Sequence, residues 1–111
     1  MTQVTGKREK SSAMAKLLES SITETIQLSL GSVVYGALSP FLHIKDYPRR
    51  PGLFDKDLRA FFGGTAAVIE IMAVKDMCRK TGLPYYPAEP FSFEAWCREI
   101  EAHLANMKGG S

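Results

Sequence analysis

One nearly uncharged segment limits what this chain can fold into. Residues 61–74, FFGGTAAVIEIMAV, hold a single charged side chain, Glu70. Asp55 before the segment is suited to cap a helix start, and Gly82 after it is suited to end a helix in the left-handed conformation. We therefore expect one long helix that begins at Asp55 and whose residues 58–77 are apolar nearly all the way round. A chain of 111 residues has little other surface with which to cover such a helix.

The two sides of this predicted helix differ in side-chain size. Small residues surround Glu70 at helical spacing, whereas the opposite side carries bulky ones such as Phe62 and Met72. The bulky side can build the core, and small residues let a second backbone approach closely. We predict that this small side, together with small positions of an earlier helix, forms an interface made of Gly63, Ala66, Ala67, Glu70, Val74, Ser29 and Gly36.

Glu70 itself has three interpretations. A carboxylate in an apolar seam is costly unless it is paired, hydrogen-bonded or protonated. It can reach water at the rim or meet a basic residue of its own subunit. It can lie at an interface and bond a hydroxyl group of a partner. It can also be a proton-handling or ligand-binding acid with a raised pKa.

Two further helices complete the predicted fold. Apolar residues recur every four positions from Met14 to Leu38, which predicts a helix from Ser11 or Ser12 to Pro40. Ser92 is suited to cap a last helix that ends before Gly109. We thus expect an all-α fold with two long antiparallel helices and a shorter C-terminal helix packed across them. Residues 11–108 form its single domain, and oligomerisation completes a helical bundle.

Composition gives little support to nucleic-acid binding. The formal net charge is only +2, and the basic residues of the N-terminus fall in residues 1–10, which we expect to be a disordered arm. Arg49 and Arg50 lie in a loop between two prolines and are the remaining candidates for a loop contact. The stretch from Pro48 to Pro51 resembles a minimal ligand for an aromatic groove, although a stiff connector is the simpler interpretation.

The sequence offers no pattern for catalysis or for metal binding. The two histidines, His43 and His103, lack further ligands at suitable spacing, and FFGGTA lacks the Lys-Ser/Thr of a phosphate loop. Cys78 and Cys97 are too few for a disulfide framework, which indicates reduced thiols. We therefore predict no cofactor, no metal and a cytoplasmic location for the chain.

These patterns favour a non-enzymatic interaction protein, an adaptor, inhibitor or accessory subunit that pairs with itself or docks on a larger protein. A first alternative is a helical pocket for an apolar or cofactor-like ligand, with Glu70, Tyr35 or His43 as the polar contact. A second is a membrane hairpin of residues 26–44 and 59–74. Pro40 and Glu70 interrupt its two segments, and basic residues on both sides give it no preferred orientation.

Overall fold

The computed structural model describes the backbone of residues 2–109 and the side chains of residues 13–107. Within these residues the fold is all-helical and contains no strand, which confirms the predicted class. With a Cα radius of gyration of 14.3 Å, the fold is compact. The α-helices are α1 (Thr2–Leu30), α2 (Ser32–Leu38), α3 (Gly52–Phe62), α4 (Ala66–Thr81) and α5 (Phe93–Gly109), and the 3-10 turns are η1 (Ser39–Phe41), η2 (Ile44–Asp46) and η3 (Gly63–Thr65).

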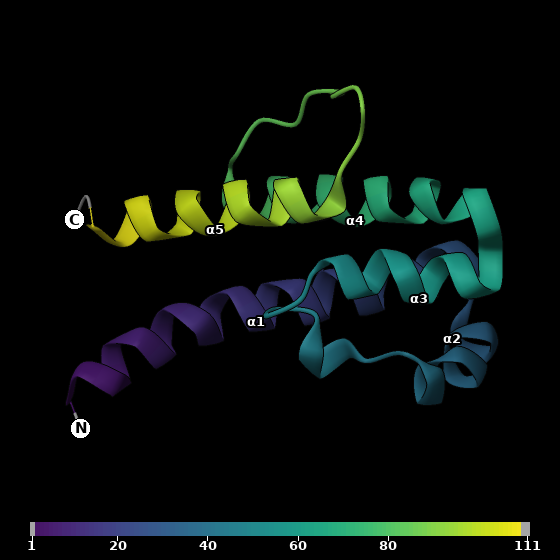
Figure 1. The fold of residues 1–111 in the computed structure, drawn as a ribbon, viewed down its shortest axis with the longest axis horizontal. Helices are drawn as coiled ribbons and strands as arrows, with labels where there is room; N and C mark the ends of the chain where they lie inside the picture. Colours follow the sequence, from purple (N-terminus) through teal and green to yellow (C-terminus); the bar gives the residue numbers. More distant parts are fainter. Residues whose placement is uncertain (1, 110–111) are drawn as a thin grey trace.

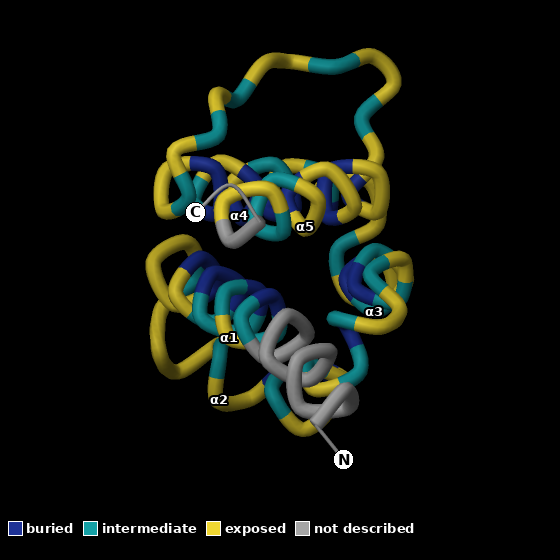
Figure 2. The backbone as a smooth tube through the Cα atoms, turned by 90° about the vertical axis from the view of Figure 1, so that its left-hand side faces the viewer, coloured by how far each residue is buried: buried dark blue, intermediate teal, exposed yellow. Residues whose placement is uncertain are grey.

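The helices form two layers. Helices α4 and α5 lie over α1 and α3, and α2 sits beneath the end of α1, as Figures 1 and 2 show. The segment that joins α4 to α5 arches away from the bundle, but Tyr85 turns back and stacks on Trp96 at a ring-centroid distance of 5.3 Å. Both ends of the chain lie at one end of the bundle, and α2 and the α3–α4 turn lie at the other.

The long central helix that we predicted is broken. The chain leaves α3 at Gly63, whose φ of 58° is in the region that favours glycine, and doubles back through η3 into α4. The helix also begins at Gly52, so Asp55 is inside its first turn and is not the cap. The prediction of a continuous rod over residues 58–77 is therefore wrong, because two adjacent glycines supply a turn that lets α3 and α4 pack on each other.

The predicted first helix is interrupted as well. Gly31 has a φ of 90° and separates α1 from α2, and Pro40 then lies in the 3-10 turn that follows α2. Helix α1 runs from Thr2, earlier than Ser11 or Ser12. The side chains of residues 1–12 lie outside the described part, and the disordered arm predicted for residues 1–10 remains a prediction.

The last helix agrees with its sequence signals. The hydroxyl of Ser92 accepts a hydrogen bond from the backbone N–H of Ala95 at 3.1 Å, so the predicted cap is confirmed. Glu94 and Arg98 approach to 3.5 Å one turn apart, as expected for this spacing. Before the linker, α4 ends at Gly82 in the left-handed conformation, also as predicted.

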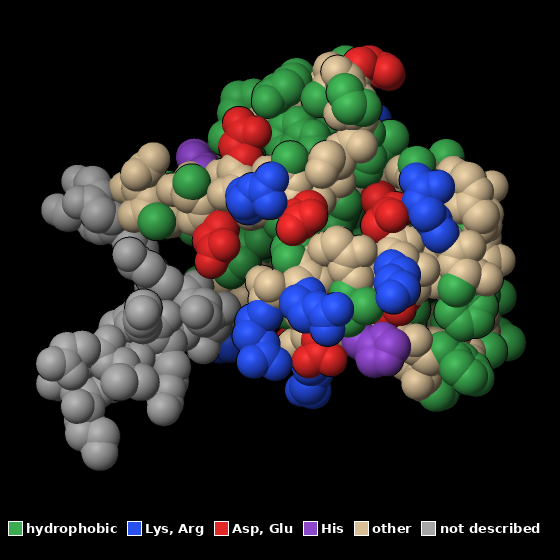
Figure 3. Space-filling view, in the orientation of Figure 1, with side chains coloured by type: hydrophobic (Ala, Val, Ile, Leu, Met, Phe, Trp, Pro, Cys, Tyr) green, Lys and Arg blue, Asp and Glu red, His purple; other side chains and the backbone are tan. Residues whose placement is uncertain are grey.

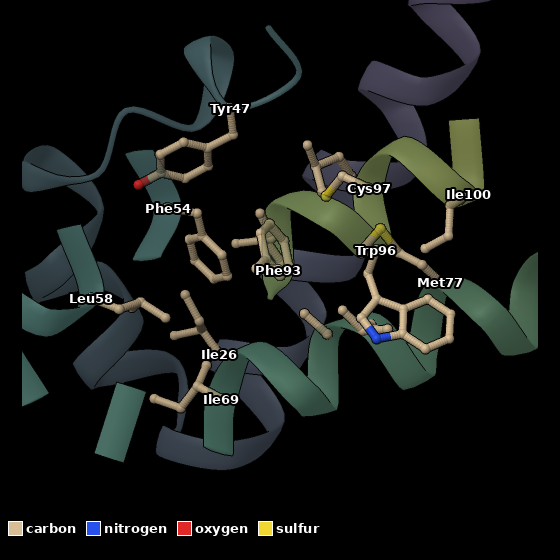
Figure 4. Close-up of a cluster of buried hydrophobic side chains, with 14 of the residues drawn as sticks. Ile26, Tyr47, Phe54, Leu58, Ile69, Met77, Phe93, Trp96, Cys97 and Ile100 are labelled. Carbon is tan, nitrogen blue, oxygen red and sulfur yellow. The ribbon is translucent and has the colours of Figure 1, made fainter. Parts of the chain in front are cut away.

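The core joins all of these helices. Phe54 of α3 lies between Tyr47 and Phe93 of α5, with ring-centroid distances of 5.1 and 4.8 Å (Figure 4). Trp96 of α5 and Met77 of α4 are buried in the same cluster. Such tilted aromatic pairs add specific contacts to the hydrophobic burial itself. Among the fully buried side chains are Leu18, Ile22, Ile26, Leu58, Val74 and Ile100.

The membrane hairpin proposed as an alternative consists of residues 26–44 and 59–74. Each is divided by a break, at Gly31 and at Gly63 respectively. No helix in the described part of the chain has both the length and the hydropathy needed to cross a bilayer.

Candidate functional site

The predicted interface positions separate into two groups. Ala66, Glu70 and Val74 are buried inside the single chain, so in this fold they contribute to its own core. Ala67 is half-buried beside Glu70. The other positions remain exposed: Ser29, Gly36 and Gly63. The small face around Glu70 is thus covered by the chain itself, because α3 folds back onto α4.

The exposed predicted positions share one end of the molecule with large apolar side chains. Leu28 at the end of α1 and Val33 in α2 are 86% and 87% exposed, which is unusual for residues of this size in a folded domain. We call the apolar end the set of exposed hydrophobic residues from α1, α2, η1, α3 and α4, namely Leu28, Val33, Val34, Phe41, Phe61, Val68 and Met72.

Contacts inside the apolar end link its elements. Phe41 and Phe61 make an edge-to-face pair with ring centroids 5.9 Å apart, which ties η1 to the end of α3. The hydroxyl of Ser29 lies 3.5 Å from the sulfur of Met72, and Leu28 and Met72 line one hollow between α1 and α4. In Figure 3 hydrophobic side chains gather at the lower right, on the side of the bundle remote from both termini.

Glu70 occupies a different place, inside the α3–α4 hairpin. Its side chain is 2% exposed and faces Asp55 of α3, and the two carboxyl groups hydrogen-bond to each other. Arg59 donates from Nε to both oxygens of Asp55 at 2.9 and 3.0 Å. The first interpretation, a wet position at the rim or a basic partner in the same subunit, does not describe this fold, because Glu70 is buried and its partner is a second acid.

The two carboxyl groups differ in charge. Burial, followed by the hydrogen bond with Asp55 and its negative charge, raises the pKa of Glu70 to about 9. The pKa of Asp55 is lowered, first by the hydrogen bond with Glu70 and then by Arg59, against the effect of burial. At neutral pH Glu70 is therefore protonated and donates to the Asp55 carboxylate.

A cavity of about 380 Å³ opens beside this pair. It lies between α3, α4 and the start of α5, and we call it the Glu70 cavity. Oε2 of Glu70 is buried and exposes almost no surface to this cavity. Its lining combines polar and apolar groups, namely Gly52, Asp55, Arg59, Ala67, Glu70, Phe91, Ser92, Phe93 and Glu94.

The other two polar contacts proposed for a pocket, Tyr35 and His43, do not approach Glu70. Neither of them lines the Glu70 cavity. The hydroxyl of Tyr35 lies 3.5 Å from that of Thr23 on α1. Nδ1 of His43 lies 2.8 Å from Oδ2 of Asp57, at the surface of α3.

Sequence reasoning missed the group of three that includes His43. Tyr47, fully buried, donates its hydroxyl to Oδ2 of Asp57 at 2.6 Å, and the backbone N–H of His43 lies 3.3 Å from the same oxygen. Burial raises the pKa of Asp57, but the hydrogen bonds from Tyr47 and His43 lower it more. These hydrogen bonds hold the loop after α2 against α3. The only sequence signal for them is a histidine, a tyrosine and an acid around a proline-rich loop.

The thiols and the loop arginines show no arrangement for chemistry. Cys78 and Cys97 are free and buried, and burial raises the pKa of the Cys97 thiol to about 12 and that of Cys78 also above its usual value. Arg49 and Arg50 are exposed in the loop, where Arg49 lies 3.6 Å from Asp46. No three metal-ligating side chains in the described part are placed to hold a metal ion.

Comparison of the chain with protein-family models, with curated proteins and with solved structures found no match.

Proposed function

We propose that the protein is a small interaction protein, an adaptor, inhibitor or accessory subunit, that associates through the apolar end with a second copy of itself or with a larger protein. The exposure of large apolar side chains from α1, α2, η1, α3 and α4 at one end of the bundle is the observation that supports this function. Apolar surface gains roughly 25 cal/mol for each Å² removed from water, so this end favours contact with another surface.

The surface shape of the apolar end suits packing against a helix of a partner. Large side chains such as Val33 and Met72 alternate with small exposed positions, Ser29, Gly36 and Gly63. Large residues next to small ones provide the ridges and hollows into which another helix packs.

Molar mass in solution tests the proposal. Light scattering after gel filtration should give a mass above that of one chain, or a second protein that co-purifies in fixed proportion. The double variant Leu28→Ser/Val33→Ser should reduce the mass to that of one chain, because both side chains are fully accessible and do not support the core. Met107→Ser is the matched control, since Met107 is 54% exposed but lies on α5 at the opposite end.

Two results would contradict the proposal. One is a well-folded wild-type chain that stays monomeric at high concentration and co-purifies with no other protein. The other is an associated wild type whose mass responds to Met107→Ser and not to Leu28→Ser/Val33→Ser, which would place the contact on α5.

A further inference from the structure

A hollow between α1 and α4 joins the apolar end to charged side chains. We call it the α1–α4 hollow, and its volume is about 310 Å³. Leu28 and Met72, which belong to the apolar end, form one part of its lining. Lys75 follows Met72 after three residues on the same side of α4, and Arg79 follows Lys75 after four. A partner that covers Leu28 and Met72 therefore also meets charged groups.

The accessible charges of the α1–α4 hollow are positive. Asp76 is the single acid among the described residues that line it, and its carboxylate already binds Arg79 and Lys80. The side chain of Asp76 is 17% exposed, whereas that of Arg79 is 71% exposed. Lys75 is exposed, and its Nζ lies 5.4 Å from the ring centre of Tyr85. Within the described residues Lys75 takes part in no ion pair, so a carboxylate of a partner can reach it.

A second copy that presents the same end has no carboxylate to offer. The two segments that form the apolar end, residues 25–45 and 58–75, contain no Asp and a single Glu. That residue is Glu70, which is 2% exposed. In a symmetric dimer both partners use the same surface, so contact through this end sets basic groups against basic or apolar ones. The exposed charged side chains of the two segments are all basic: Lys45, Arg59 and Lys75.

We propose that the apolar end binds a helix of a different, larger protein, and that this helix carries Asp or Glu along the border of its apolar face. The inference rests on the proposed function and chooses between the two partners named there. The apolar face of the helix covers Leu28 and Met72, and an acid at its border pairs with Lys75 and Arg79. Opposite charges at the border of an interface favour the correct partner and speed its association.

The fixed relief of this end favours a protein helix over an anionic lipid surface. The hydroxyl of Ser29 lies 3.5 Å from the sulfur of Met72, and Phe41 and Phe61 hold each other edge to face. Hollows and ridges in fixed positions are matched by the side chains of another folded surface. Lipid chains are fluid and have no fixed shape that such relief could match.

Two synthetic peptides test this inference, each an amphipathic helix of about 18 residues with Leu and Ala on one face. One peptide carries Glu along both borders of that face, and the other carries Gln at the same positions. Titration calorimetry in about 0.05 M NaCl should show that wild type binds the Glu peptide at least about threefold more tightly than the Gln peptide. The difference should disappear in about 1 M NaCl, because salt then screens charges beyond about 3 Å.

The variant Lys75→Gln identifies the basic group that the peptide meets. It should lose most of the preference for the Glu peptide while it still binds the Gln peptide as wild type does, since its apolar contacts are unchanged. Lys16→Gln is the matched control. Lys16 is exposed on α1 and lines a separate hollow, so its substitution should leave the preference intact.

Three results would overturn the inference. One is equal binding of the two peptides to wild type at low salt, or binding of neither. Another is a dimer of the wild-type chain alone that is lost in Leu28→Ser/Val33→Ser, because the partner would then be a second copy. The third is binding to vesicles of phosphatidylcholine with about 30% phosphatidylserine in preference to the Glu peptide, which would make the partner a lipid surface.

The outcome is separable from that of the proposed function. A dimer that depends on Leu28 and Val33 would support association through the apolar end and reject only the acidic partner. Binding of the Glu peptide that is equally tight in wild type and in Leu28→Ser/Val33→Ser would instead place the contact elsewhere, and that result counts against the proposed function itself.

Discussion

Glu70 on α4 and Asp55 on α3 hydrogen-bond to each other through their carboxyl groups, and burial keeps the proton on Glu70. The pair joins the two arms of the α3–α4 hairpin at a point where Glu70 is buried and the side chain of Asp55 is 36% exposed. Hydrogen-bonded acids of this kind hold a structure together only while one of them stays protonated.

Stability should therefore fall as the pH rises. The pKa of Glu70 is raised from 4.5 to about 9, so the folded chain binds a proton that the unfolded chain releases above pH 4.5. Burial, the hydrogen bond with Asp55 and the negative charge of Asp55 raise this pKa, and the positive charge of Arg59 opposes them. This part of the stability is fully present below pH 4.5 and is lost progressively as the pH rises toward 9.

The variant Glu70→Gln should remove most of that dependence. Its amide donates to Asp55 as the protonated acid does, without the cost of keeping a proton at neutral pH. We expect the variant to be more stable than wild type by about 2–3 kcal/mol at pH 7 and nearly equal to it at pH 4.5. Denaturant unfolding of wild type and variant between pH 4.5 and pH 7 measures both differences in stability. Parallel pH profiles of wild type and variant would show that Glu70 is not the titrating group.

The turn at Gly63 should not accept a side chain. Its φ of 58° with a ψ of −135° is strained for any L-residue, although a Cβ would have open space around it. Gly63→Ala should lower the free energy of unfolding by about 1–3 kcal/mol. Gly64→Ala is the matched control, since Gly64 has no positive φ and equal space, and it should change stability by less than about 1 kcal/mol. Equal effects of the two substitutions would mean that the turn conformation is not what matters.

The hydroxyl of Tyr47 should contribute more than that of Tyr35. It is buried and donates to the Asp57 carboxylate at 2.6 Å, whereas the Tyr35 hydroxyl lies 3.5 Å from Thr23. We expect Tyr47→Phe to cost about 1.5–3 kcal/mol and Tyr35→Phe to cost less than about 0.5 kcal/mol.

The hydrogen bond between Tyr47 and Asp57 should also make the stability of the fold depend on pH. The pKa of Asp57 is held below its usual 3.8 despite burial, by hydrogen bonds from Tyr47 and His43. Its contribution is present above pH 3.8 and is lost as the pH falls through the lowered value. Acid unfolding of Tyr47→Phe should therefore begin at a higher pH than that of Tyr35→Phe, and coincident acid transitions would contradict this assignment.

The thiols should be inert in the folded protein. Burial raises the pKa of Cys97 to about 12 and that of Cys78 above its usual range, so little thiolate forms near pH 8. Iodoacetamide should modify neither residue within the time in which it modifies both in denaturant, as intact mass shows. Rapid modification of Cys97 in the native protein would indicate that α5 opens from the core.

The sequence predicts the parts of the fold that depend on local signals. The Ser92 cap and the left-handed Gly82 each depend on residues within one turn, and both are present. The breaks at Gly31 and Gly63 were missed because a glycine inside a helix costs only about 1 kcal/mol, and packing elsewhere decides whether the helix continues.

The pairing of Glu70 with Asp55 depends on the helix break at Gly63. Asp55 and Glu70 stand at equal distances from the Phe62–Gly63 junction, so a turn at that point brings them together. Read on a continuous helix, they lie several turns apart, and Glu70 has only small apolar neighbours. The carboxyl pair could therefore be predicted from the sequence only if Gly63 and Gly64 were interpreted as a hairpin turn.

Concentration-dependent NMR of the labelled chain tests the central claim, association through the apolar end, most directly. Methyl signals of Leu28, Val33, Val34, Val68 and Met72 should shift or broaden with increasing concentration, or on addition of a co-purified partner, while those of Ile100 and Met107 should not. Signals that stay unchanged at the apolar end under both conditions, or changes confined to α5, would contradict the claim.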